Sequence, residues 1–388
     1  AGNDTVIAGA NLTFGTTIVG GDGTDILSAI FGTAAAAGSV VSGFETLTLA
    51  TAGTTDLDNF GNNTFTTVNL TAGGAAQAVQ SVRSETITVT AALGADATVT
   101  MEDATGTADT ATIAISSAAA VDTTNDILVA GVETINLVMD DTNTTAHQNT
   151  IDLGADSAST INISGDAGVI FATGGGTDIA DVLTMDAGSV VLGAVTDNGV
   201  TYAATYNTTG GVTTLTGSNG VDSLTGGAVT NDTISGGSGV DTLVYTGGTD
   251  TFTSGAGNDV IDVNAVGAAA GSLTIADIAD GDTIDLVGAA TGTIADVTAA
   301  NFAAAEVTLG SAATLANYLD SAADQNGAGA GLVEWFEFSG DTYIVVSNDD
   351  GTTGNSAGFT AGTDVAIKLT GLFNIDDSSI TNEIITIA

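Results

Sequence analysis

The chain has 388 residues, and its 46 acidic residues face only two basic ones, Arg83 and Lys368, giving a formal net charge of −44. So few cations argue against binding to nucleic acid or to an anionic membrane surface. The absence of Cys excludes disulfides and thiolate metal sites, and a single histidine, His147, restricts histidine-based catalysis.

Hydrophobic residues make up 43% of the chain, in short Thr-rich runs of Ala, Val, Ile and Leu, which predicts a folded β protein rather than a disordered one. No apolar run reaches the ~18 to 20 residues of a membrane span, so we expect no transmembrane insertion. Asp in Gly-rich turns suits calcium, which prefers oxygen ligands; a solvated acidic surface of the halophile type is the alternative.

The first distinctive element is the nonapeptide Gly20–Ser28, which reads Gly-Gly-Asp-Gly-Thr-Asp-Ile-Leu-Ser and matches the pattern G-G-x-G-x-D-x-U-x. In such a unit six residues turn and three form a short strand, while the glycines let backbone carbonyls approach an ion. Gly20, Asp22 and Asp25 are therefore candidate calcium ligands. An ordinary Gly-Asp turn is the alternative for this isolated copy.

Short strands with alternating apolar and Thr or Asn residues follow. Gly43–Leu49 reads Gly-Phe-Glu-Thr-Leu-Thr-Leu, and Gly131–Leu137 repeats it as Gly-Val-Glu-Thr-Ile-Asn-Leu. Thr67–Thr71 is echoed by Thr160–Ser164, each with Asn at its third position. This period of two predicts strands, and Asn recurring in register indicates side chains that stack along successive coils of a solenoid. Glu45 and Glu133 are either ligands or, more commonly, residues that face solvent or satisfy a turn.

Five Asp residues in the third quarter of the chain are phased at spacings of 10, 9, 9 and 9; they are Asp222, Asp232, Asp241, Asp250 and Asp259. Two positions after each Asp stands a large apolar residue, and two positions before four of them stands Gly. Two units make one coil, so Asp241 and Asp259 should share one flank, and Asp232 and Asp250 the other. The further candidate ligands in this tract are Gly217, Asn219, Gly236, Ser238, Gly247, Gly255 and Gly257.

The chain changes character after residue 290. Leu315, Tyr318, Leu319 and Ala322 have helical spacing, with Ser311 as the expected N-cap. Two strands, 333–338 and 342–346, flank Ser339-Gly340-Asp341, which predicts a hairpin. Strands are also expected at 365–369 and 384–388, completing a small α+β domain that caps the solenoid.

Residues 217–286 resemble the calcium-binding RTX repeats of proteins exported by type I secretion, including the segment 273–286 that commonly follows such repeats. The strand units at 43–49 and 131–137 resemble those of RTX-type bacterial surface-layer proteins, and 338–351 with 362–372 are similar to their C-terminal domains. Two units depart from the pattern: Ala-Val-Thr precedes Asn231-Asp232, and Tyr245 opens the unit of Asp250.

The expected fold is thus all-β: an elongated parallel β-solenoid or β-roll with calcium-binding RTX repeats and a small α+β C-terminal cap. We expect three domains: a strand-repeat solenoid at 1–216, the RTX β-roll at 217–290 and a capping, assembly and secretion domain at 291–388. The resemblance implies several bound Ca²⁺ ions, export by a type I system to the bacterial cell surface, and self-assembly there. No signal-peptide pattern is visible at residues 1–10.

Three functions compete. The first is a structural surface-layer protein, with other copies of itself as partners and cell-surface polysaccharide as a further candidate partner. The second is an RTX adhesin or filament subunit. The third is a calcium-dependent polysaccharide lyase or epimerase, for which Arg83 and Lys368 are the only Arg or Lys bases; we therefore expect no enzyme.

Overall fold

The computed structural model describes residues 2–8, 15–29, 39–61, 63–71, 76–143, 147–172, 179, 182–203, 213–228, 230–263, 271–286, 306–323, 332–347, 358–360, 364–375, 378–381 and 384–387. They form two compact units, Ala1–Gly193 and Ala194–Ala388. The predicted domain boundaries at 216/217 and 290/291 stay predictions.

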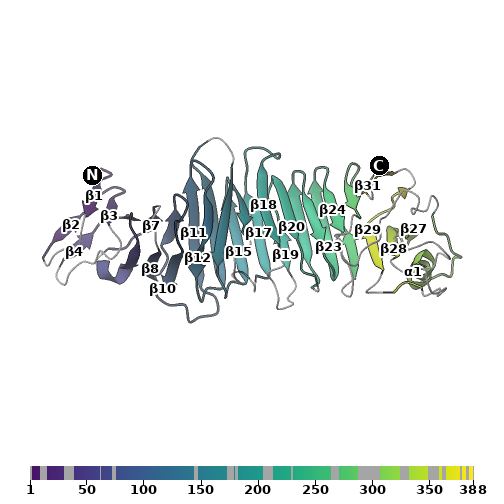
Figure 1. The fold of residues 1–388 in the computed structure, drawn as a ribbon, viewed down its shortest axis with the longest axis horizontal. Helices are drawn as coiled ribbons and strands as arrows, with labels where there is room; N and C mark the ends of the chain where they lie inside the picture. The colour runs from purple at the N-terminus through teal and green to yellow at the C-terminus, as the bar shows by residue number, and fades with distance from the viewer. Residues whose placement is uncertain are drawn as a thin grey trace. The chain divides into compact units, whose positions relative to one another are not determined.

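In the first unit, the chain winds through two parallel sheets in alternation, so that odd-numbered strands stack in one sheet and even-numbered strands in the other. The odd sheet contains β1 (Thr5–Ala8), β3 (Ile26–Ala29), β5 (Thr46–Leu49), β7 (Thr67–Leu70), β9 (Thr86–Val89), β11 (Thr110–Ser117), β13 (Thr134–Asp141), β15 (Thr160–Gly165) and β17 (Thr184–Val190). The even sheet contains β6 (Gly53–Asp56), β8 (Gln77–Val82), β10 (Ala97–Met101), β12 (Asp122–Val129), β14 (Gln148–Gly154) and β16 (Gly168–Phe171). A separate pair, β2 (Thr17–Val19) and β4 (Val40–Ser42), and the short helix η1 (Leu57–Phe60) complete the unit (Figure 1).

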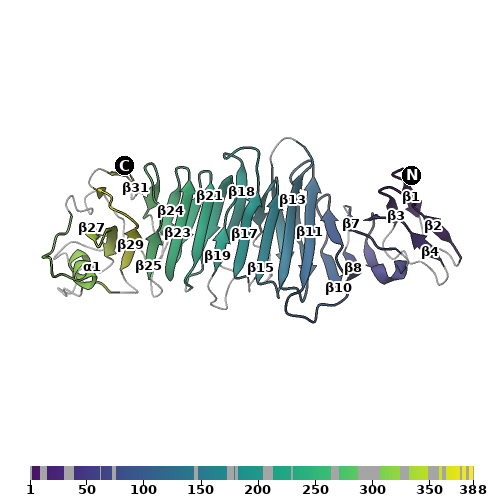
Figure 2. The ribbon, with the colours of Figure 1, turned by 180° about the vertical axis from the view of Figure 1, so that it is seen from behind.

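The second unit winds in the same way. Its odd sheet contains β19 (Thr214–Thr216), β21 (Thr233–Ser238), β23 (Thr249–Ala256) and β25 (Ser272–Ile275), followed by β29 (Val365–Leu369), β28 (Asp341–Ser347) and β27 (Leu332–Phe338). Its even sheet contains β18 (Asn198–Ala203), β20 (Val221–Thr225), β22 (Thr242–Tyr245), β24 (Val260–Val263) and β26 (Thr283–Asp285), followed by β31 (Ile384–Thr386) and β30 (Ser379–Thr381). The view from behind shows β21, β23 and β25 side by side (Figure 2).

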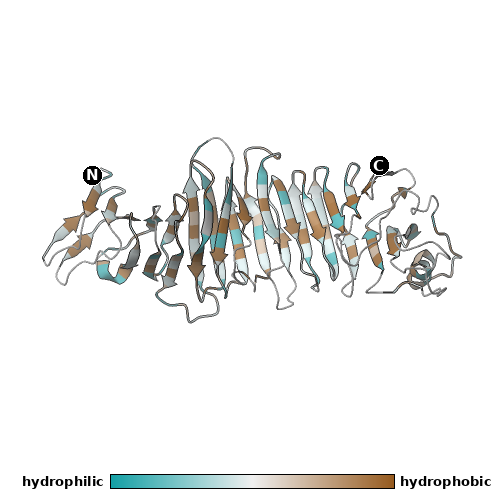
Figure 3. Ribbon diagram, viewed as in Figure 1, coloured by the Kyte–Doolittle hydropathy of each residue, from teal (hydrophilic) through white to brown (hydrophobic). Residues whose placement is uncertain are grey.

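Alternating side chains explain why these segments stack. In each strand the apolar residue points inward and is buried, as Leu47, Val68 and Ile87 are on three successive coils, while Thr, Ser or Asn points outward. Figure 3 shows this alternation as brown and pale bands along the strands. Coils of this kind bury one continuous apolar column, and each coil hydrogen-bonds only to its neighbours. The predicted all-β parallel solenoid is confirmed.

The predicted register is confirmed as well. Thr242 pairs with Val260, and Thr233 with Thr251, so one coil of the repeat tract advances by 18 residues. The stacked Asn side chains are present too, although the register joins different copies from those compared above: Asn162 Nδ2 donates to Asn136 Oδ1 at 3.0 Å.

The C-terminal elements form where the sequence predicts them, with one correction. The helix α1 spans Leu315–Ala323 and packs on β27 and β28, but its N-cap is Thr314, whose hydroxyl accepts from the Asn317 N–H at 3.4 Å. Ser311 lies outside that turn, so its prediction as N-cap was wrong. The hairpin of β27 and β28 turns at Ser339 and Gly340, both with positive φ, as a two-residue primed turn requires.

Candidate metal centre

Two rows of buried aspartates run across the coils of residues 213–286. In the first row, which follows the even sheet, the backbone N–H of Asp222 donates to Asp241 Oδ1 at 2.8 Å, and that of Asp241 donates to Asp259 Oδ1 at 2.8 Å. Asp259 continues the row through Asp282 Oδ1 at 2.9 Å. In the second row, which follows the odd sheet, the Asp232 N–H donates to Asp250 Oδ1 at 2.8 Å. Each flank therefore carries the residues that the nine-residue spacing predicts.

The turns before these aspartates depend on glycine. Gly239 and Gly257 have φ of 129° and 156°, and a Cβ on either would collide with a backbone carbonyl of the preceding coil. Only glycine allows coils to approach this closely, so the Asp that follows two residues later turns its carboxylate inward. Asp241 and Asp259 are fully buried as a result.

Burial disfavours the charged form of these carboxylates. Desolvation raises the pKa of Asp241 to about 7, and the neighbouring charges of Asp222 and Asp259 add to the effect. Desolvation also raises the pKa of Asp250 to about 7, and the pKa values of Asp222 and Asp259 to about 6. Near neutral pH these rows therefore require protons or a bound cation for their stability.

Several of the carboxylates keep one oxygen without a hydrogen-bond partner. The buried Oδ2 atoms of Asp25, Asp241, Asp250 and Asp259 are unpartnered among the described residues. Beside two of them a glycine leaves open space. A Cβ on Gly236 would lie 2.5 Å from Asp241 Oδ2 and would overlap the Ser254 carbonyl of the next coil. Two oxygens from different coils thus converge where no side chain intervenes, and such an arrangement suits a hard cation.

The same arrangement occurs near the start of the chain. A Cβ on Gly20 would lie 2.8 Å from Asp25 Oδ2 and would overlap the carbonyl of Gly43. Asp25 Oδ1 accepts the Asp4 N–H at 2.7 Å, so the carboxylate is held in place while Oδ2 stays open. Asp22 does not join this site, because its side chain is exposed.

Asp222 and Asp232 are already satisfied by the protein. Ser218 donates both its N–H, at 2.8 Å, and its hydroxyl, at 3.0 Å, to Asp222 Oδ2. Gly227 N–H donates to Asp232 Oδ2 at 2.6 Å, and the Thr230 hydroxyl donates to Oδ1 at 2.7 Å. Both aspartates lie in the predicted rows, yet their oxygens have less capacity left for a cation than those of Asp241 or Asp25.

The remaining predicted ligands lie at the turns around the rows. A Cβ on Gly217 would lie 2.8 Å from Asp222 Oδ2 and would overlap the Gly236 carbonyl, which makes a third glycine-lined space. Ser238 N–H donates to the Ser218 carbonyl of the preceding coil at 3.3 Å. Gly247 is buried, Asn219 and Gly255 are partly exposed, and Gly257 is exposed. At Asp250 the first glycine of the unit is replaced by Tyr245, whose hydroxyl donates to the Gly248 carbonyl at 2.9 Å.

Two aspartates with roles at these rows escaped the sequence pattern. Asp282 ends the first row, and Asp277 caps the coil above it by accepting the N–H groups of Ser254, at 2.7 Å, and Gly255, at 3.0 Å. Asp277 stands 18 residues after Asp259, so the period did place an acid there. The coil between them is longer than 18 residues, however, and Asp282 takes the position in the row.

In the first unit, glutamates occupy the equivalent corner. Asp25 N–H donates to Glu45 Oε2 at 2.7 Å, and Asp109 N–H donates to Glu133 Oε2 at 2.8 Å. Both glutamates therefore satisfy a backbone group of the coil before them, which was one of the two alternatives.

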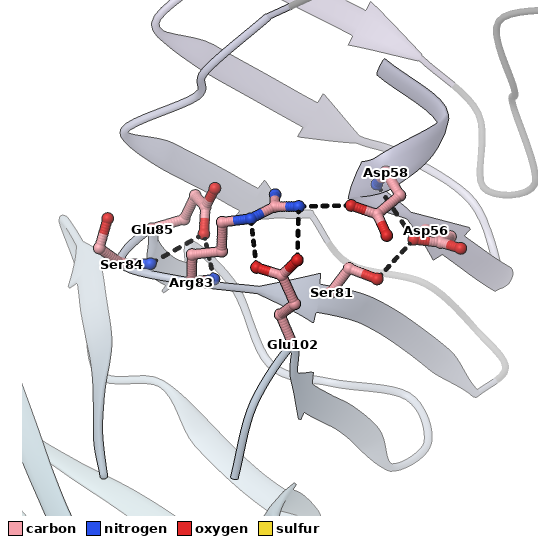
Figure 4. A network of polar contacts seen from close by, with 7 residues as sticks. All are labelled: Asp56, Asp58, Ser81, Arg83, Ser84, Glu85 and Glu102. Carbon is pink, nitrogen blue, oxygen red and sulfur yellow. Dashed lines mark hydrogen bonds and ion pairs between the residues drawn. The ribbon is translucent and has the colours of Figure 1, made fainter. Parts of the chain in front are cut away.

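The basic residues serve ion pairs. Arg83 joins three coils by contacting Asp58 of η1, at 2.5 Å, and Glu102 after β10 (Figure 4). Beside it, Ser81 donates to Asp56 at 2.7 Å, and Glu85 accepts the Arg83 N–H at 2.6 Å. Lys368 pairs with Asp341 at 2.8 Å, and His147 Nδ1 lies 3.0 Å from Asp141 Oδ2.

Among the described residues, no three acidic or histidine side chains gather as a metal-binding group. A cation in the aspartate rows would therefore combine carboxylates with backbone carbonyls, which is the donor mixture that calcium accepts. In the same part of the chain, no helix is both long and apolar enough to cross a membrane. Comparison of the sequence with protein-family models and with curated proteins finds no match.

Proposed function

We propose that the chain is a structural protein of the bacterial cell surface, whose solenoid is completed by calcium and which assembles with other copies into a surface layer. One observation carries the calcium requirement: buried carboxylate oxygens of Asp25, Asp241, Asp250 and Asp259 have no partner. Buried, unpaired carboxylates are strongly destabilising, and a divalent cation bound by oxygens of successive coils would compensate them.

The location follows from the same chemistry. Calcium is scarce in the cytosol and plentiful outside cells, so the rows would be charged and unstable before export and stabilised after it. Binding energy spent on the native state alone is folding energy, and folding would thus be coupled to arrival outside the cell. The resemblance to RTX-type surface-layer proteins supports export by a type I system and a structural rather than a catalytic role.

Self-assembly of a chain with a net charge of −44 also needs cations. Like charges repel across a contact, and calcium both neutralises the aspartate rows and lowers the charge that a second copy meets. The proposal therefore predicts assembly that depends on calcium at constant ionic strength, with magnesium a poor substitute because it demands smaller, more regular octahedral sites.

The test is negative-stain imaging of the full chain with calcium, with magnesium and with a chelator. Two-dimensional sheets that form in calcium and dissolve in chelator are the expected result. One-dimensional fibres would replace the surface-layer proposal by a filament or adhesin. Dispersed monomers of unchanged secondary structure under all three conditions would contradict both the calcium requirement and assembly.

A further inference from the structure

The two outward faces of the first unit differ in charge. On the odd sheet, the register aligns one outward residue from each of six successive coils: Thr46, Thr67, Thr86, Thr112, Asn136 and Asn162. None of these side chains is charged, and the neighbouring column, two positions further along each strand, carries no charge over the same six coils either. We call these two columns the hydroxyl face.

The outward face of the even sheet is acidic. Asp56 of β6 and Asp122 and Asp126 of β12 point outward there, alternating with buried residues such as Thr55 and Ile127. A protein with 46 acidic residues therefore leaves one face of its solenoid free of them over six coils. Thr and Asn suit a strand exposed to solvent, but Asp and Glu would serve there as well, so the segregation is what calls for an explanation.

We infer that the hydroxyl face is a contact surface for a second copy of this chain, a statement that rests on the proposed self-assembly. Charge is the first reason, since at a net charge of −44 only an uncharged face can meet its own copy without cations between them. Hydrogen-bonding capacity is the second. Hydroxyl and amide groups both donate and accept, so this face is complementary to itself, whereas carboxylates only accept.

The shape of the face favours a copy over a small ligand. Small molecules bind in concave sites, while the outward residues of parallel strands form a flat surface. In the described part of the chain, the strands of this face contact mainly their neighbours in the sheet. Six strands spaced ~4.8 Å apart, with three or four residues of ~3.3 Å each, cover roughly 300 to 400 Å². A stable pair buries about 800 Å² on each partner, so this contact is one of several that a lattice would use together.

The experiment compares matched charge insertions in the full chain. Thr67→Asp with Thr134→Asp adds two charges to the hydroxyl face, and Thr98→Asp with Thr100→Asp adds two to exposed positions of β10 on the acidic face. Assembly is followed by sedimentation and negative stain over a concentration series in calcium, and folding by circular dichroism. We expect the first variant to fold but to need at least tenfold more protein to assemble, while the second assembles like wild type.

A cross-linking arm keeps the inference testable where a charged variant fails to fold. The chain has no Cys, so Thr112→Cys and Thr98→Cys each provide one reporter thiol. Under assembling conditions a short bis-maleimide should link Thr112→Cys copies and leave Thr98→Cys copies unlinked. Equal assembly of both charge variants, or equal cross-linking at both positions, overturns the hydroxyl-face contact while leaving calcium-dependent assembly intact. A wild-type chain that stays monomeric in calcium overturns both.

Discussion

The coil corners of the first unit and those of residues 213–286 solve the same geometric problem with different residues. In both, an acidic side chain accepts a backbone N–H from the coil before it, as Glu133 does for Asp109 and Asp241 does for Asp222. Glutamates 45 and 133 are partly exposed, whereas Asp241 is fully buried with Oδ2 unpartnered beside a glycine. The difference teaches that the carboxylate hydrogen bond belongs to the fold, while burial and the open oxygen belong to the cation.

The largest effect should come from exchanging the charge at that corner. Asp241→Asn keeps an acceptor for the Asp222 N–H but removes the carboxylate charge. In calcium we expect a loss of about 3 kcal/mol in the free energy of unfolding, because a ligand is lost. In chelator at pH 7.5 the same variant should be more stable than wild type, since a buried uncompensated charge is gone. Urea denaturation under both conditions measures this.

Glu133→Gln is the matched control in the first unit. It should cost about 1 kcal/mol or less, by the same amount with calcium and with chelator, because its carboxylate only completes a backbone hydrogen bond. A calcium-dependent loss at Glu133, or a loss at Asp241 that does not change sign, would remove the distinction between the two regions.

The glycine beside Asp241 gives the next effect. A Cβ in Gly236→Ala would occupy the space between Asp241 Oδ2 and the Ser254 carbonyl. Calcium affinity should fall by about tenfold or more, equivalent to about 1.4 kcal/mol, when measured by isothermal titration. Gly61→Ala is the control, because its nearest neighbour, the Asp58 carbonyl, would be an ordinary 3.4 Å away. Equal calcium affinities in the two variants would contradict the site.

Acid should stabilise the calcium-free repeat region. The folded pKa values of Asp241 and Asp250, about 7, lie above those of an unfolded chain, so the folded state binds more protons. This contribution is fully present below about pH 4 and is lost as pH rises through about 6 to 7. Calcium-stripped protein should therefore have a higher urea midpoint at pH 5 than at pH 7.5. In saturating calcium the order should reverse, because protons compete with the cation.

The smallest effect concerns Arg83. Its contacts with Asp58 and Glu102 are half exposed, and exposed ion pairs are worth under about 1 kcal/mol. Arg83→Gln should lower the free energy of unfolding of the first unit by that amount at low salt and by less at high salt. A loss that salt leaves unchanged would show that Arg83 acts through packing instead of charge.

The sequence was sufficient for the features that repeat. Period-two strands, the 18-residue coil and the flank of each phased Asp follow from spacing, because every coil repeats the environment of the last. It was insufficient where the period fails. Asp282 replaces the regularly spaced Asp277 because the intervening coil is longer, and Ser218 satisfies Asp222 through contacts that no spacing reveals. Thr314, instead of Ser311, caps the helix because the chain enters it one turn later.

The most direct test of the central claim is region-resolved hydrogen exchange of the full chain in calcium and after chelation at pH 7.5. We predict that amides of β20 to β24, between Val221 and Val263, lose protection on chelation, while those of β9 to β15, between Thr86 and Gly165, keep theirs. Equal protection of both regions with and without calcium would contradict the account, because the buried aspartate rows would then be stable without a cation.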